Sequence, residues 1–286
     1  MSSNINLSQL PEPEVVEALD FEVILAALRA DLLARAPNLG DALDLESEPV
    51  TKLLEAFAYR ELLLRQRIND AARAVMLPYA SGTDLDNLVA LLGVERLTDE
   101  SDERLRARAN LAPETFSIAG PRLAYRAHAM SASSAIRDVA VLSPEPGWVR
   151  IVVLAEPSVS HINGVPDANL LAAVQAVVNA DHVRPLCDQV EVQAADILTY
   201  QVSATLHMLP GPGHELALST ARAAVSAYAL ERLALGRGVA RTGLIAALHA
   251  PGVERVTLTQ PAADLVCSVE QAAHLTAMTL AVETMA

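Results

Sequence analysis

Apolar residues recur at helical spacing from Val50 to about Leu77. Glu48-Pro49 places an acidic residue and a proline where helices begin, and Pro78 lies just beyond the last apolar position. Because no glycine or proline interrupts the stretch, it predicts one helix of roughly eight turns. The positions that define its apolar stripe are Val50, Leu53, Leu54, Phe57, Leu64, Ile68, Ala71, Ala72 and Val75.

The polar face of this predicted helix is rich in arginine. A solvated face on a helix whose apolar stripe faces the core would explain the pattern. A docking face that meets another subunit would also explain it, because arginine suits interfaces and the chain uses little lysine. On the second interpretation, the subunit-interface candidates are Arg60, Arg65, Arg67, Asn69, Asp70 and Arg73.

Further helical patterns surround this element. Residues 14–36 carry a helical stripe that ends before Pro37, and Thr83-Asp84 begins a shorter helix that ends near Gly93. Ser101 caps another short helix, which Pro113 interrupts. We therefore predict a helical domain over residues 14–119. The polar arm before it, residues 1–13, is expected to need a partner to become ordered.

The hydrophobic period changes after Gly120-Pro121. A helix over residues 122–131 is followed by β-branched runs at 136–142 and 148–154, which a proline- and glycine-containing turn joins into a hairpin. An apolar helix through Val178 and a strand over 186–192 complete a compact α+β unit, residues 120–194.

A second α+β unit is predicted over residues 195–286. Its expected strands cover residues 197–208, 253–259, 265–269 and 275–282, and its expected helices cover 215–235 and 242–249. The run AIRDVAVL, which contains the first strand of the hairpin, resembles GVERVTLT near the C-terminus, and each follows a short helix. The fold class is thus α+β, with a helical N-terminal domain and two small modules that a duplication would relate.

Composition narrows the classes of function. The 286 residues are 52% hydrophobic but only 3% aromatic, so few side chains could stack on bases or sugars. The net charge is −14 and basic residues are interspersed with acidic ones, which disfavours binding to nucleic acid or to an anionic membrane surface. No secretion signal and no apolar stretch of membrane-spanning length is evident. We therefore expect synthesis in a cytoplasm, from which the chain either does not leave or leaves by a route that the sequence does not show.

Candidate chemistry is sparse. Neither the seven histidines nor Cys187 and Cys267 occur at metal-ligand spacing, and no nucleotide-binding or nucleophile motif is present. We expect no catalytic residue, no cofactor and no metal. Two alternatives stay open: an enzyme whose site is assembled from distant segments, and a cytoplasmic adaptor protein.

Several long stretches resemble the baseplate assembly protein J family of contractile-tailed phages and related injection particles. They cover most of the chain in order: residues 46–94, 102–133, 136–154 (IRDVAVLSPEPGWVRIVVL from Ile136) and 221–258. The resemblance implies a structural wedge subunit whose copies pair within a wedge and join wedges into a ring around the tail hub. That ring would open when the sheath contracts.

The same resemblance implies partners and a location. The neighbours would be other copies of the chain, a protein I-like subunit and a lysozyme-like small wedge subunit, without nucleic acid or membrane insertion. The chain would be assembled in the host bacterial cytoplasm and end in the tail baseplate of the virion. The adaptor alternative would be unrelated to tails.

Overall fold

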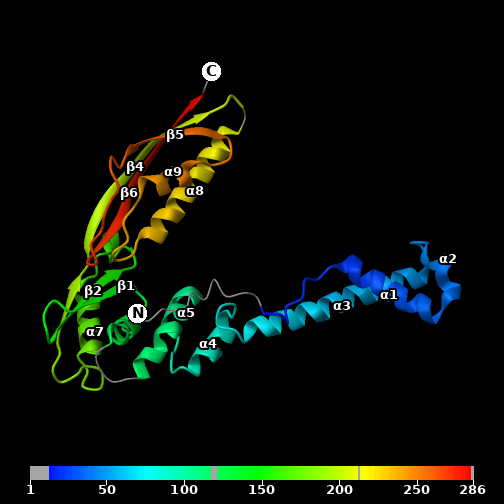
Figure 1. Ribbon diagram of the computed structural model, residues 1–286, viewed down its shortest axis with the longest axis horizontal. Coiled ribbons are helices and arrows are strands. Elements are labelled where there is room, and N and C mark those ends of the chain that lie inside the picture. Colours follow the sequence, from blue (N-terminus) through cyan, green and yellow to red (C-terminus); the bar gives the residue numbers. More distant parts are fainter. Residues whose placement is uncertain (1–12, 117–120, 212, 285–286) are drawn as a thin grey trace. The chain divides into compact units, whose positions relative to one another are not determined.

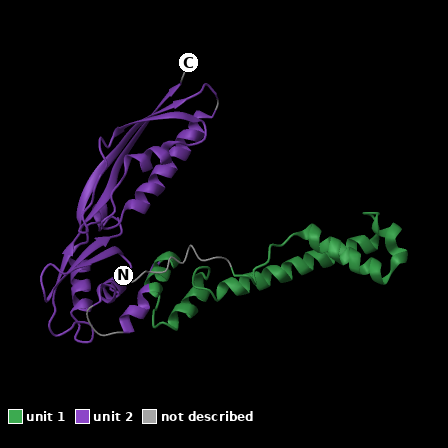
Figure 2. Cartoon of the chain, viewed as in Figure 1, with its two compact units in different colours: residues 1–96, 101–110 green, residues 97–100, 111–286 purple. Residues whose placement is uncertain are grey.

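A computed structural model describes residues 13–116, 121–211 and 213–284. The chain is a mixed α+β protein with a helical N-terminal region, as the sequence predicts. It folds into two compact units, residues 1–96 with 101–110 and residues 97–100 with 111–286 (Figure 2). The predicted arm, residues 1–13, lies outside the described residues except for Pro13.

The first unit is built on a helical hairpin. Helix α1 (Phe21–Arg35) packs along α3 (Pro49–Ala74), and the short helices η2 (Pro37–Leu39) and α2 (Gly40–Leu43) close its tip (Figure 1). The predicted long helix is confirmed, although it ends before Leu77. The first helix begins seven positions later than the predicted Glu14, because Asp20 is its N-cap and accepts hydrogen bonds from the backbone of Glu22 and Val23.

Two shorter helices complete the first unit: α4 (Gly82–Ala90) and α5 (Asp102–Leu111). The backbone N–H of Arg104 donates to the Ser101 hydroxyl, which confirms the predicted cap of α5. In the second unit, the 3₁₀ helix η3 (Ala112–Phe116) continues from α5 through Pro113. The helical pattern is thus broken where proline removes a backbone donor.

The second unit contains two three-stranded sheets. The first is preceded by α6 (Arg122–Ser131) and consists of β1 (Ile136–Leu142), β2 (Trp148–Ala155) and β3 (Gln189–Ala194). Strand β2 is central, antiparallel to β1 and parallel to β3, as expected for a hairpin followed by a helical crossover. That crossover contains η4 (Ile162–Gly164) and α7 (Ala168–Val178), and the side chains of α6 and α7 form one buried cluster with those of β1 and β2.

The second sheet has the order β5-β4-β6. Its central strand β4 (Asp196–Met208) is antiparallel to β5 (Val253–Gln260) and parallel to β6 (Gln271–Thr284). Helices α8 (His214–Arg232) and α9 (Arg241–Leu248) share a buried cluster with β4 and β5. The strand predicted over residues 265–269 is wrong: Leu265 forms only an isolated bridge with Val239.

The predicted duplication fails in the connectivity of the strands. Both sheets have a central strand with one antiparallel and one parallel neighbour. However, β1 pairs with the strand that follows it, whereas β5 and β6 lie on opposite sides of β4. The similar runs AIRDVAVL and GVERVTLT therefore belong to edge strands of two sheets whose chain order differs, so they reflect a shared strand environment.

The two sheets belong to one compact unit. Arg137 on β1 donates hydrogen bonds to the carbonyls of Leu230 and Leu233 at the end of α8, at 2.6 and 2.7 Å. The backbone N–H of Leu235 donates to the Asp138 carboxylate. These contacts join the segments 120–194 and 195–286, whose assignment as separate domains stays a prediction.

Candidate interface site

Helix α3 buries a different face from the one that the apolar pattern predicts. Ala58 and Asn69 are its buried residues, and Leu54 and Leu62 lie half-buried along the same face. Their spacing of about four and seven residues defines one helical face. Since α1 is the helix that packs along α3, this face is the one that the hairpin covers.

Asn69 is a polar residue on this covered face. Its side-chain oxygen accepts a hydrogen bond from the backbone N–H of Glu17 at 3.1 Å, and its side-chain nitrogen donates to the Glu17 carbonyl at 2.8 Å. The residue is only 3% exposed. Because both halves of the amide have a partner, the buried polar group is satisfied and fixes the segment before α1 on α3.

Arg65 lies beside Asn69 and also binds Glu17. Its guanidinium forms ion pairs with the carboxylates of Glu17, at 3.0 Å, and Glu61, at 2.7 Å. The hydrogen bonds to Glu61 and then to Glu17 raise the pKa of Arg65 above its usual value. This half-exposed cation is therefore already bound to two carboxylates of its own chain.

The six predicted interface residues do not share one environment. Arg65 and Asn69 are brought together around Glu17. Arg60 and Arg67 are exposed and lie two turns apart on the same face. Asp70 is exposed and accepts a hydrogen bond from Gln66, while Arg73 is half-buried. The role of these six residues in an interface stays a prediction. Arg60 and Arg67 are exposed on one face of α3, two turns apart.

An exposed apolar stripe runs beside these two arginines. Phe57, Leu64 and Ile68 are 57%, 66% and 58% exposed, although the sequence pattern assigns them to the core-facing stripe. Leu53 and Val75 continue the stripe towards the two ends of α3 and are also exposed. Helix α1, which has the most extensive contact with α3 among the described helices, covers the adjacent face instead.

The sequence contains a signal for this arrangement. Apolar residues occur on α3 at positions 53, 57, 64 and 68 and also at 54, 58 and 62, so they cover two adjacent faces. A helix that is apolar over more than one face needs more than one partner. Because Asn69 is polar, a pattern of hydrophobic residues alone does not indicate that this second face is buried.

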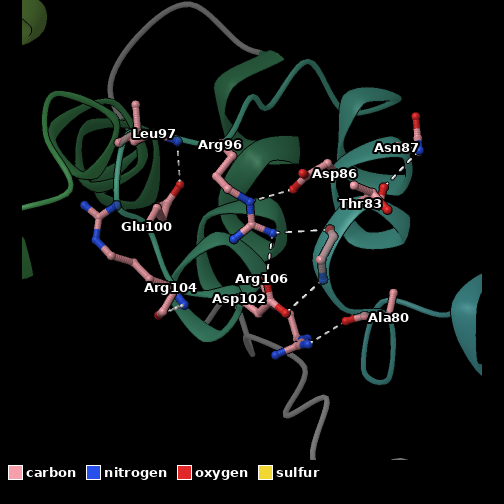
Figure 3. A network of polar contacts seen from close by, with 12 residues as sticks. Ala80, Thr83, Asp86, Asn87, Arg96, Leu97, Glu100, Asp102, Arg104 and Arg106 are labelled. Atoms are coloured by element: carbon pink, nitrogen blue, oxygen red, sulfur yellow. Dashed lines mark hydrogen bonds and ion pairs between the residues drawn. The ribbon is translucent and has the colours of Figure 1, made fainter.

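A polar network fixes the other end of the first unit (Figure 3). Arg96 forms ion pairs with Asp86 of α4 and Asp102 of α5, each at 2.7 Å. The second carboxylate oxygen of Asp102 accepts a hydrogen bond from the backbone N–H of Gly82 at 3.0 Å. Arg96 therefore connects the first turn of α5 to α4.

Hydrogen bonding shifts the protonation of this network. The Gly82 N–H, followed by the Arg96 guanidinium, holds the pKa of Asp102 below its usual value. The hydrogen bond to Asp86 raises the pKa of Arg96. Each charge favours the other's ionised form, so the cluster stays ionised at neutral pH.

Arginines of α5 add backbone contacts to the same region. Arg106 donates to the carbonyls of Leu77 and Ala80, both at 2.8 Å, and so binds the chain between α3 and α4. Arg108 donates to the Glu95 carbonyl at 3.1 Å and is buried. These arginines contact backbone carbonyls within the first unit and so hold its connecting segments against α5.

Among residues 13–116, 121–211 and 213–284, no group of histidine, cysteine and carboxylate side chains is placed to hold a metal ion. No helix in those ranges has the length and apolar character needed to cross a membrane.

Comparison with known proteins identifies relatives along most of the chain. Residues 46–102 match the Baseplate J-like N-terminal domain, residues 117–194 the Baseplate J-like central domain, and residues 200–281 the Baseplate J-like protein C-terminal domain. The chain is also 43% identical, over 292 aligned positions, to the protein named Baseplate protein J from Escherichia phage P2. That alignment covers 95% of each chain.

Proposed function

The chain belongs to the baseplate J-like family, and from this premise we propose that it is a wedge subunit that links wedges into a ring around the tail hub. The relationship supports a structural role in a phage tail baseplate and a location in the virion tail. The proposal adds the ring, its opening on sheath contraction, and assembly in the bacterial cytoplasm. It assigns the chain no catalytic activity.

The exposed apolar stripe of α3 is the surface that we propose for contact with another subunit. Phe57, Leu64 and Ile68 form a continuous apolar surface that no described segment of the chain covers. A large apolar patch on a water-soluble unit marks a surface that another protein covers. A long amphipathic helix is buried by laying this face against a partner helix, with anchors at spacings of three and four residues.

Arg60 and Arg67 would form the polar rim of this contact. They lie on the edge of the stripe, and arginine at an interface rim gives specificity and a salt-dependent association rate more than affinity. Acidic residues are abundant in this chain, with 35 Asp and Glu against 21 Lys and Arg. A second copy could therefore supply carboxylates to this rim, as could a protein I-like or a lysozyme-like wedge subunit.

Cross-linking mass spectrometry on intact particles tests the proposed role. We expect links from residues 46–111 to other copies and to wedge subunits at the tail end of the particle. Links from residues 196–284 should change after triggered contraction. If the chain is missing from sedimented particles and stays in the free fraction of the lysate, the proposed function is wrong.

A pair of matched variants tests the stripe. Leu64→Glu with Ile68→Glu places two carboxylates on the exposed face of α3, so the isolated chain should fold normally while tail assembly falls by at least about tenfold. Leu91→Glu is the control, because Leu91 is 83% exposed at the end of α4, outside the stripe. Equal assembly by both variants would exclude the stripe as a contact.

A further inference from the structure

The outer edge of β6 is unusual for an exposed strand. Among the described residues, β4 is the only strand that pairs with β6, so the outer edge of β6 over residues 277–283 has no strand partner. The strand is 14 residues long. It contains no charged residue and no proline before Glu283. Exposed edges are normally protected by charges, prolines, bulges or short length, because they otherwise pair with other chains.

The opposite edge of the same sheet has those protective features. Strand β5 carries Glu254 and Arg255 and is followed by Pro261. Its register with β4 shifts at two positions, and it spans eight residues. In β6 the single register shift lies at Thr276, after which residues 277–284 follow β4 without interruption. One edge is thus protected against pairing and the other is suited to it.

The alternation along β6 divides its side chains between two faces. Met278, Leu280 and Val282 lie opposite Val202, Ala204 and Leu206 of β4, which are buried on the helix-covered face. Ala277, Thr279, Ala281 and Glu283 lie on the other face, where the Glu283 carboxylate lies 3.2 Å from Nδ1 of His207. The helix-covered face is therefore apolar, and the other face carries small uncharged residues up to Glu283.

We propose that residues 277–283 of β6 pair antiparallel with the same strand of a second copy of this chain, forming a continuous six-stranded sheet. This inference rests on the proposed function, because it names one surface by which copies would join in the ring. A twofold axis at Leu280 places Met278 opposite Val282 on the apolar face. It places Thr279 opposite Ala281 on the other face.

Charge favours a second copy at this edge. The chain carries a net charge of −14, so most of its surface would repel another copy. In the pairing centred on Leu280, the single carboxylate of the segment, Glu283, lies opposite Ala277 rather than its own counterpart. Like charges directly across a strand pair are destabilising, and this register contains none.

Disulfide trapping of the purified full chain tests the pairing. Cys187 and Cys267 are first replaced by serine, and Leu280→Cys is compared with Val256→Cys. Both positions are partly buried on the helix-covered face, one on each edge strand. After mild oxidation, we expect about tenfold more covalent dimer from the β6 cysteine, because only paired strands bring two Cβ atoms within bonding distance.

Charge variants check the register in the same background. Thr279→Lys with Ala281→Lys should reduce trapping at position 280 by about tenfold, because four lysines would meet across the axis. Thr279→Lys with Ala281→Glu should restore it, because each lysine then lies opposite a glutamate. Equal trapping at Val256, or equal yields from the two double variants, would overturn the proposal.

Disulfide trapping in intact particles distinguishes failure of the β6 pairing from failure of the proposed baseplate role. A chain carrying Leu280→Cys that enters particles without forming a homodimer there would refute the β6 pairing and leave the baseplate role intact. A cross-link from this cysteine to a different polypeptide would also refute it. Absence of the chain from particles would refute the baseplate role, while trapping of the purified chain would still decide the pairing.

Discussion

The side-chain amide of Asn69 forms two hydrogen bonds with the backbone of Glu17, which lies 52 positions earlier in the chain. One amide thereby satisfies a backbone donor and a backbone acceptor on a segment that no helix or sheet includes. Arg65 binds the Glu17 side chain from the next turn of α3. These contacts hold the entry to α1 on the long helix.

Replacing Asn69 should loosen this entry. Asn69→Leu keeps the number and branching of the side-chain heavy atoms but leaves the N–H and carbonyl of Glu17 without a partner, at a cost of about 1–3 kcal/mol in unfolding free energy. Urea unfolding followed by circular dichroism measures the change. Asp70→Ala is the control on the exposed neighbour and should alter stability by less than about 0.5 kcal/mol. Equal effects would mean that the amide contributes no more than an exposed side chain.

Acid should weaken the contribution of Asp102. Its pKa is lower in the folded chain than the usual aspartate value of about 3.9, so the ionised form is the one that folding favours. The resulting stability is fully present above about pH 4 and is lost as the pH falls through the folded pKa. The melting temperature of the native chain should exceed that of Asp102→Asn at pH 6, and the difference should shrink as the pH falls below about 4. A constant difference across this range would contradict the assignment.

Charge reversal on α3 should separate the rim arginines from Arg65. Arg60→Glu with Arg67→Glu changes two exposed side chains, so the chain should keep its stability within about 0.5 kcal/mol while particle assembly slows. Arg65→Glu instead places a third carboxylate beside Glu17 and Glu61, and should lower the melting temperature of the isolated chain. Normal assembly by the double variant would exclude Arg60 and Arg67 from the contact.

Arg137 should stabilise the junction between the two sheets. Its guanidinium binds the Leu230 and Leu233 carbonyls and the Glu156 carboxylate. Arg137→Met would leave the last carbonyls of α8 without this donor, costing about 2–3 kcal/mol in unfolding free energy. Arg137→Lys should not restore stability, because an ammonium group cannot reproduce the planar fork.

A surface arginine of α8 provides the matched comparison. Arg222 is exposed, so Arg222→Met should change the unfolding free energy by less than about 0.5 kcal/mol. Urea unfolding of the three variants under the same conditions measures the difference. Full stability of Arg137→Lys would show that charge alone, rather than the bidentate geometry, is required.

The sequence by itself determined the local elements. The long helix, the hairpin of Ile136–Leu142 with Trp148–Ala155, and the helix of Arg122–Ser131 follow from hydrophobic period, turn residues and caps. These signals are local, because helical and pleated spacing depend on residues a few positions apart. The helix boundary at Asp20 differs from the predicted start at Glu14, because the apolar residues between them have helical spacing although the capping side chain lies at Asp20.

Tertiary structure decided which faces are covered and which strands pair. Leu54 and Phe57 are apolar residues one helical turn apart. The packing of α1 determines that Phe57 stays exposed while Leu54 is half-buried. Likewise, β5 and β6 follow each other in the chain, but they do not pair with each other, because β4 lies between them in the sheet. A sequence pattern indicates that a helix face or a strand edge needs a partner. Which partner it receives depends on contacts between residues far apart in the chain.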